Sequence, residues 1–185
     1  MFDPIAFKTH KKHEPWPDEV IAAFLKTAPN HLRLAVMLLL YTGQRRSDVV
    51  KMKWSQFDGN FIDVVQQKTG AYVPIPCHQR LKEILNVLPR QSEFILTGER
   101  TKQYKPDSLT RLVATQLHQL GIHGYSVHGL RSNAAQALAG VGCSISEIMA
   151  ITGHKNPAMA LHYAKRAEKK KLAQAAIARW EKAAG

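Results

Sequence analysis

The chain has 185 residues, with 26 lysines and arginines against 14 aspartates and glutamates, and its formal net charge is +12. A chain of this length forms one domain, or slightly more, with a proper hydrophobic core, and its charge favours a polyanionic partner, nucleic acid before membrane. The longest apolar run, residues 34–41, is far shorter than the roughly 20 residues that span a bilayer, so we expect no membrane association.

These bulk properties leave a simpler alternative open, a basic protein whose lysines lie on solvated faces without any anionic partner. Cys77 and Cys143 lack a CxxC spacing, which is typical of reduced thiols, and no signal peptide is evident, so we expect a cytoplasmic protein. The nine histidines and two cysteines fit no standard zinc site, and we therefore expect no metal.

The first part of the chain predicts an arm followed by helices. Residues 1–15 are basic and show no periodicity, which indicates an arm or a linker remnant, whereas residues 16–185 predict one domain. Pro17 precedes an amphipathic helix with acidic residues in its first turn. A second helix is apolar almost all round and runs from about Asn30 to a break at Gly43, which predicts a central core helix.

A pair of arginines follows this break. Arg45 lies at a turn between the core helix and a short apolar helix, and Asp48 is three residues on, close enough to orient the guanidinium. Taken alone, the same residues are also typical of a surface Arg-Arg pair at a helix start.

The period of the apolar pattern changes after residue 60. Residues 61–65 and 72–75 alternate as two strands joined by a turn at 66–70, and prolines in the second strand confine it to an edge. Lys68 is at the tip of this hairpin. Taken alone, such a lysine is usually only solvent-exposed.

Further helices and one candidate strand fill the middle of the chain. Residues 81–88 predict a helix, residues 94–96 a third strand, and Ser108 the cap of another helix. The fold class is therefore mainly α with a small antiparallel β-sheet, an α+β arrangement.

Three short helices are expected between residues 127 and 163. The first has its apolar stripe over 130–139, and Ser144 with the glutamate three residues on forms a capping box that opens the second. Gly153 ends the second helix. Asn156 caps the third, which carries Tyr163 about two turns in.

Arg131 does not fit the apolar stripe of the first of these helices. A guanidinium on a buried face is unfavourable unless an anion meets it. His128 is three residues earlier on the same face, and His154 comes just past the second helix. The alternative is a helix-start histidine with an arginine that reaches the surface or pairs with a core carboxylate.

The C-terminal part predicts a separate helix over residues 166–182. It follows a run of lysines and arginines that either contacts phosphates or is a solvated face. Leu172, Ile177 and Trp180 form an apolar stripe that docks either on its own domain or on a neighbouring copy.

The chain carries, in this order, Thr42–Gly43–Gln44–Arg45, Lys68–Thr69–Gly70, His128–Gly129–Leu130–Arg131, Thr152–Gly153–His154 and Tyr163. This set resembles the catalytic domain of the tyrosine recombinases, the phage integrase family, over residues 16–167. The resemblance is specific because it combines separated motifs with an offset of nine between His154 and Tyr163.

The resemblance implies a metal-independent and cofactor-free DNA strand transferase with Tyr163 as its nucleophile. Arg45, Arg131 and the histidines would surround the scissile phosphate, with His154 hydrogen-bonded to it. Two arginines stabilise the charge that accumulates on phosphate oxygens, and their bidentate forks need no metal to do so.

The proton transfers fall to two other residues. A tyrosine is only about 0.1% ionised at pH 7, so it needs a base, and His128 is placed to accept its proton. The resemblance assigns the proton for the leaving 5′ oxygen to Lys68. The product would be a 3′-phosphotyrosyl link to Tyr163, which stores the bond for rejoining without ATP.

The resemblance also implies a double-stranded DNA partner, a bacterial or phage origin, and a homo-tetramer on DNA that assembles through the C-terminal helix, with a monomer in the absence of DNA. Two departures stand out. Ser132 follows Arg131 where the family often has a second histidine, and we expect the N-terminal DNA-clamping domain of the family to be absent, with only residues 1–15 in its place. The chain would be a catalytic fragment or a recombinase without half of its clamp.

Two rival functions share the fold. A type IB topoisomerase would relax supercoiled DNA with similar chemistry but matches this motif set less well. A non-catalytic DNA-binding module would lack the tyrosine or an arginine, and Tyr163, Arg45 and Arg131 are all present.

Overall fold

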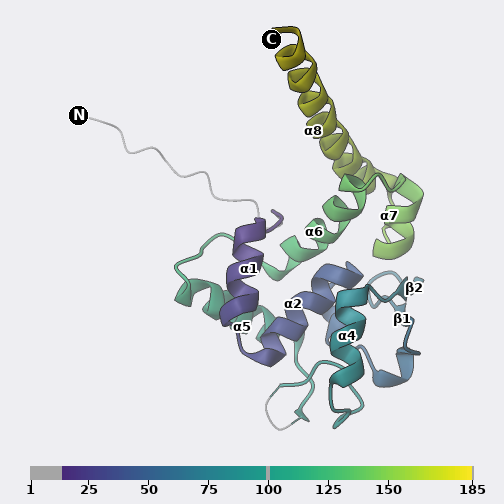
Figure 1. Cartoon of the computed structure of the whole chain (residues 1–185). Coiled ribbons are helices and arrows are strands. Elements are labelled where there is room, and N and C mark those ends of the chain that lie inside the picture. The colour runs from purple at the N-terminus through teal and green to yellow at the C-terminus, as the bar shows by residue number, and fades with distance from the viewer. Residues whose placement is uncertain (1–13, 99–100, 185) are drawn as a thin grey trace.

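The computed structural model describes residues 14–98 and 101–184 (Figure 1). Helices predominate, and the only sheet within the described residues has two antiparallel strands, so the expected fold class is confirmed. In chain order the elements are α1 (Asp18–Thr27), α2 (Asn30–Thr42), α3 (Arg46–Val49), a 3₁₀ turn (Trp54–Gln56), β1 (Phe61–Val65), β2 (Tyr72–Pro76), α4 (Gln79–Val87), α5 (Pro106–Gln119), α6 (Val127–Gly140), α7 (Ile145–Thr152) and α8 (Pro157–Ala184).

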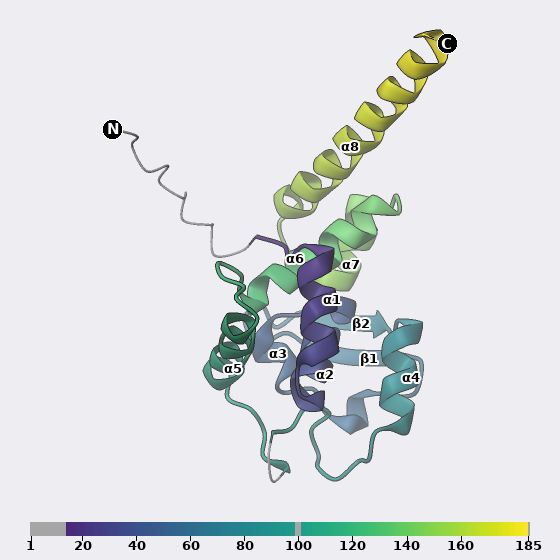
Figure 2. The same cartoon turned by 60° about the vertical axis from the view of Figure 1, so that its left-hand side comes forward.

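Helix α2 is the centre of the core, as its apolar sequence predicts. Leu38 and Leu39 in its middle are almost completely buried. Figure 2 shows α5 on one side of the α1–α2 pair and the hairpin with α4 on the other. Helix α6 packs on α2, and α7 and α8 pack on α6, so the elements that carry the candidate residues converge at one end of the core.

The hairpin has the expected alternation. Ile62 pairs with Ile75 and Val64 with Val73, and these four side chains are buried against the core. The third strand expected over 94–96 does not form, because only an isolated bridge joins Phe94 to the segment before the 3₁₀ turn. The strand prediction for that segment was wrong.

Two predicted helix starts have different outcomes. The capping box is confirmed, since the Ser144 hydroxyl accepts the backbone N–H of Glu147 at 3.2 Å and the Glu147 carboxylate accepts that of Ser144 at 2.6 Å. The cap at Ser108 was wrong, because α5 begins two residues earlier at Pro106. Proline suits the first helical position, where its missing N–H would have no intrahelical partner.

Helix α8 corrects the expectation of a short helix followed by a separate one over 166–182. It is a single helix of 28 residues that contains Tyr163 and continues to the C-terminal end of the described chain. Its second half projects from the body (Figure 1), and Leu172, Ile177 and Trp180 on it are 64%, 50% and 72% exposed. The apolar stripe therefore does not dock on the described part of its own domain.

No helix of the described residues is both long enough and apolar enough to cross a bilayer. The basic arm expected over residues 1–15 lies, up to residue 13, outside the described residues.

The segment before α1 is fastened to α6. Asn133 accepts the backbone N–H of Trp16 at 2.7 Å and donates to its carbonyl oxygen at 2.6 Å, while the Trp16 indole donates to the carbonyl oxygen of Ser126 at 2.8 Å. The carbonyl oxygen of Glu14 passes so close to Gly129 that a Cβ at that position would lie 2.2 Å from it. Glycine is needed here for space, and the contact fixes the first turn of α6.

Gly129→Ala is therefore expected to lower the free energy of unfolding by about 1–3 kcal/mol or more, because the backbone at Glu14 cannot move aside as a flexible side chain would. Urea unfolding measures the change. Gly140→Ala in the same helix is the control, because nothing lies within 4 Å of its added Cβ, and it should be neutral or stabilising. Equal stability of the two variants would contradict the steric argument.

Candidate active site

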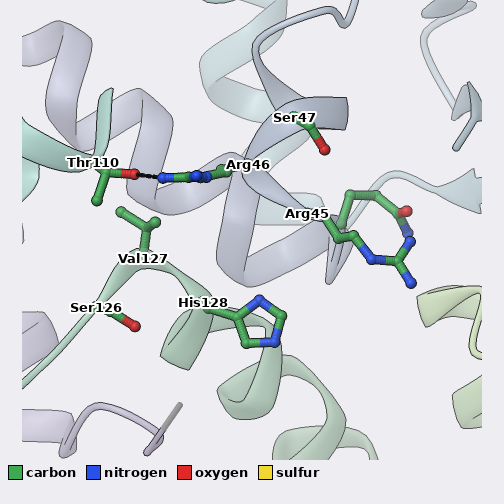
Figure 3. Close-up of a pocket in the computed structure, with 8 residues that line it drawn as sticks. Arg45, Arg46, Ser47, Thr110, Ser126, Val127 and His128 are labelled. Atoms are coloured by element: carbon green, nitrogen blue, oxygen red, sulfur yellow. Dashed lines mark hydrogen bonds between the residues drawn. The ribbon is translucent and has the colours of Figure 1, made fainter. Parts of the chain in front are cut away.

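Arg45 and His128 reach one pocket from different elements. Arg45 directly precedes α3, and His128 lies in the first turn of α6. Both residues line a cavity of about 540 Å³, and Ser47, Thr110 and Ser126 also line it. Figure 3 shows how these side chains lie. These two residues, 83 positions apart in the chain, thus meet at an open cavity because α6 packs on α2.

Arg131 is buried on α6, as its place on the apolar stripe predicts. It is 3% exposed, and its Nη1 donates to the carbonyl oxygen of Gly43 at 2.8 Å. Gly43 has φ 63°, the left-handed conformation that ends α2 and aims this carbonyl at the guanidinium. Nη2 of Arg131 is buried and has no hydrogen-bond partner among the described residues.

The pKa of Arg131 is lowered to about 10, first by burial and then by the charge of Arg45, whereas Asp48 and Tyr163 act in the opposite direction. The guanidinium is still charged at neutral pH. A buried charged donor left without a partner is unfavourable by about 1–3 kcal/mol or more, so the arrangement favours an incoming anion.

His154 follows α7, whose end is set by Gly153 in the left-handed conformation. Its pKa is lowered from 6.5 to about 4, mainly by burial and then by Arg131, Arg45 and His128. The ring is therefore neutral near pH 7. Its Nδ1 lies 2.7 Å from the hydroxyl oxygen of Thr152, and that hydroxyl donates its one hydrogen to the carbonyl oxygen of Ile148 at 2.7 Å. The neutral ring therefore carries its hydrogen on Nδ1, which donates to Thr152, and its Nε2 is an acceptor.

This lowered pKa predicts a stability change with pH. Between pH 6.5 and about 4 the unfolded chain binds a proton at His154 that the folded chain does not, so folding stability falls as the pH falls through this window. Melting temperatures of wild type and His154→Asn should converge at lower pH, because the variant lacks this loss. His123→Asn, a change at an exposed histidine, should keep the wild-type slope; a parallel fall of wild type and His154→Asn would refute the prediction.

Tyr163 lies in the second turn of α8 and is 7% exposed. Its hydroxyl donates to Oγ of Ser132 at 2.8 Å, on α6 and next to Arg131. Its ring packs in a small cluster of apolar residues from α6, α7 and α8. Tyr163 is thus held near the buried Arg131. Its hydroxyl binds Ser132, the residue at which this chain departs from the family motif.

Asp48 makes no hydrogen bond or ion pair with Arg45, contrary to the expectation that it orients this guanidinium. Its Oδ1 accepts the backbone N–H of Gln67 in the hairpin loop at 2.8 Å. The acceptor of Arg45 is Gln66, whose Oε1 lies 2.9 Å from Nη1. Asp48 acts on the site by supporting the loop and by its charge near Arg131.

Lys68 is the one candidate that the structure does not bring to the others. It is exposed in the loop between β1 and β2 and makes no hydrogen bond or ion pair with any described residue. The structure therefore gathers Arg45, His128, Arg131, His154 and Tyr163, and leaves Lys68 on a loop beside them.

Two buried glutamines are the residues that sequence reasoning missed. Gln44 and Gln66 are 0% and 1% exposed, and Nε2 of Gln66 donates to Oε1 of Gln44 at 2.6 Å. A glutamine in a turn is ordinarily exposed, so neither position carries a local signal of burial. Only the placement of Gln44 beside the arginine motif could have drawn attention to it.

Known proteins of one family share the sequence pattern and the fold of this chain. The sequence model described as the phage integrase family matches residues 17–170. The chain belongs to the phage integrase family. The integrase of Escherichia phage HK022 is 28% identical over 150 residues, with 73% of this chain and 41% of the relative covered, and that of Escherichia phage lambda is 30% identical over 158 residues, with 75% and 42% covered.

Solved integrase structures share the fold. A fragment of lambda integrase, as a dimer bound to a COC′ core site, gives a TM-score of 0.72 at 26% identity and covers 85% of this chain and 61% of that one. The lambda integrase catalytic core gives 0.68 at 26% identity, with 77% and 92% covered. A lambda integrase tetramer bound to a Holliday junction gives 0.68 at 26% identity, with 83% and 50% covered. The chain thus spans about two fifths of the length of its integrase relatives, and its fold is that of the tyrosine recombinase catalytic domain.

Proposed function

We propose that this integrase-family domain cleaves and rejoins double-stranded DNA at specific sites through a 3′-phosphotyrosyl intermediate. The observation that carries the proposal is the buried Nη2 of Arg131, a charged donor without a partner among the described residues. The Tyr163 hydroxyl binds the next residue of α6, Ser132, at 2.8 Å. A phosphodiester oxygen would satisfy this donor. The site would then contain an anion, two permanent cations and an oxygen nucleophile.

The cleavage step balances with the groups of this chain. The Tyr163 oxygen forms a bond to phosphorus while the bond from phosphorus to the 5′ oxygen breaks. His128 accepts the phenolic proton, and Lys68 donates a proton to the leaving 5′ oxygen once the exposed loop closes on DNA. Rejoining reverses these transfers, with a 5′-hydroxyl as the nucleophile.

Charge stabilisation would supply most of the rate. Negative charge grows on the non-bridging oxygens as the tyrosine attacks, and Arg45 and Arg131 carry fixed charges around that position. His154 would add an Nε2 donor when the Thr152 hydroxyl turns from the carbonyl oxygen of Ile148 to Nδ1, because the hydrogen of the neutral ring is then on Nε2. The Tyr163 hydroxyl must leave Ser132 to reach the phosphate, and that exchange replaces one hydrogen bond whose net contribution is about 0.5–1.5 kcal/mol.

The net charge of this chain and the DNA-bound structures of lambda integrase both support DNA as the partner. The net charge of +12 attracts a polyanion, and the lambda integrase structures contain a core site or a Holliday junction. The lambda protein forms a tetramer on the junction. We propose the same assembly for this domain, in which the exposed stripe at Leu172, Ile177 and Trp180 docks on a neighbouring copy, with a monomer in the absence of DNA.

The test is covalent trapping. A duplex with a nick near the cleaved phosphate loses its short 5′-hydroxyl product by diffusion, so rejoining fails and the protein–DNA adduct accumulates and survives denaturant. A non-catalytic DNA-binding module would give no adduct. A topoisomerase-like activity would give the adduct and relax supercoiled plasmid, but would not exchange strands between two duplexes.

A further inference from the structure

The loop between β1 and β2 contains a buried amide whose hydrogen bonds all stay inside the protein. Oε1 of Gln66 accepts from Nη1 of Arg45 at 2.9 Å and from the hydroxyl of Thr69 at 2.8 Å. Its Nε2 donates to Oε1 of Gln44 at 2.6 Å and to the carbonyl oxygen of Thr152 at 2.8 Å. One side chain thus joins the segment that carries Arg45, the loop that carries Lys68 and the end of α7 that precedes His154.

Gln44 and Gly153 form the surroundings of the Gln66 amide and fit it closely. Gln44 is itself fixed, because its Nε2 donates to the carbonyl oxygens of Ile151 at 2.8 Å and Thr42 at 3.1 Å. A Cβ on Gly153 would lie 2.3 Å from Nε2 of Gln66, so the amide passes against the bare backbone of the turn before His154. A network that satisfies its buried polar groups holds one geometry, whereas a partly satisfied one is unfavourable.

A neutral acceptor suits an arginine that serves a phosphate. The oxygen of Gln66 fixes the direction of the Arg45 guanidinium without cancelling its charge. A carboxylate at the same place would pair with Arg45 and compete with the phosphate for it. Asp48, the nearby carboxylate, is directed to the backbone of Gln67 instead.

We propose that Gln66 is a positioning residue for DNA cleavage that acts through Arg45, whose guanidinium it orients. The proposal rests on the proposed function. Gln66 itself would not touch the DNA, because it is 1% exposed. Its contribution is the preorganisation of a donor, and loss of one such donor typically slows a reaction about 10²–10³-fold.

The experiment measures single-turnover cleavage of the nicked duplex at saturating protein, together with DNA affinity and melting temperature. Gln66→Met keeps the length of the side chain and removes its donor and acceptor atoms. We expect cleavage to slow about 10²-fold while the dissociation constant for DNA changes less than about threefold. In an Arg45→Ala background, the same change should slow cleavage less than about threefold, since the residue through which it acts is gone.

Gln56→Met is the matched control. The Gln56 amide also bridges the base of the hairpin, with Nε2 donating to the carbonyl oxygen of Asp63 at 2.7 Å and Oε1 accepting from the backbone of Lys53 at 2.8 Å, but it does not reach Arg45. Loss of the Gln56 amide should lower the melting temperature and leave the cleavage rate unchanged. A purely structural role of Gln66 would make the two variants alike.

The proposal is overturned if Gln66→Met cleaves within threefold of wild type, or if its loss is as large in the Arg45→Ala background as in wild type. If Gln66→Met unfolds at the assay temperature, Gln66→Glu replaces it. That variant keeps an acceptor for Arg45 but neutralises its charge, so we expect cleavage at least about tenfold slower, and a wild-type rate would overturn the proposal. An adduct in Tyr163→Phe would overturn the proposed function instead, whereas loss of that adduct alongside a wild-type rate for Gln66→Met overturns the positioning role alone.

Discussion

Tyr163→Phe is expected to abolish the covalent adduct with the nicked duplex, with cleavage reduced at least about 10⁴-fold. The phenyl ring keeps the packing against α6 and α7 but has no oxygen to bond to phosphorus. The fold should remain, because the change removes a single hydrogen bond, the one to Ser132. Denaturing electrophoresis of end-labelled DNA measures the adduct.

Tyr72→Phe is the control for the loss of a tyrosine hydroxyl. Tyr72 is 62% exposed on β2 and donates to Asp63, so its adduct yield should match that of wild type. DNA affinity of Tyr163→Phe should also stay close to wild type, since the hydroxyl is buried in the free protein. An adduct formed by Tyr163→Phe would refute the nucleophile assignment.

Arg131→Met is expected to lower the cleavage rate about 10²–10³-fold without lowering the free energy of unfolding by more than about 1 kcal/mol. The two effects differ because Arg131 is a buried charge with one unpaired donor. This donor lowers the stability of the DNA-free protein but stabilises a bound anion. Methionine fills a similar volume without that charge. Single-turnover cleavage and urea unfolding measure the two quantities.

Arg33→Met provides the comparison for the arginine prediction. Arg33, on α2, also donates to a backbone carbonyl, that of Ala28 at 2.5 Å, but its side chain is exposed and it lies outside the site. We expect an unchanged cleavage rate. If Arg131→Met cleaves as wild type does, or loses stability and activity in proportion, the arginine supports the fold rather than the phosphate.

Most local features could be predicted because their causes lie within a few residues. The capping box at Ser144, the glycine end of α7 at Gly153 and the alternation of the hairpin depend on backbone hydrogen bonds and on side-chain period. The burial of Arg131 was also predictable, since the apolar residues around it on α6 define the inner face. The order and spacing of the motifs likewise predicted the family that the comparison then identified.

Errors arose where two local signals competed. Ser108 is a good cap, yet Pro106 two residues earlier already has the backbone angle of a first helical residue. The lysines after Tyr163 were interpreted as a break between helices, but lysine and alanine are strong helix formers, and α8 runs through them. Asp48 was expected to orient Arg45 because the two residues are close in sequence. In the fold its carboxylate accepts the backbone N–H of Gln67 instead, and proximity in sequence could not show this.

The amino-acid sequence by itself determined most of the helix ends and the spacing of the motifs. It also determined the family and the set of groups able to act on a phosphate. Folding decided which of these groups meet. Gln44, Gln66 and Ser132 have hydrogen-bond partners in segments 21 to 107 residues away, and whether a polar atom is buried or satisfied depends on such distant packing. Local periodicity carries no information about these pairings. A buried polar group is unfavourable unless its hydrogen-bond partner is buried with it, and that partner comes from a distant segment.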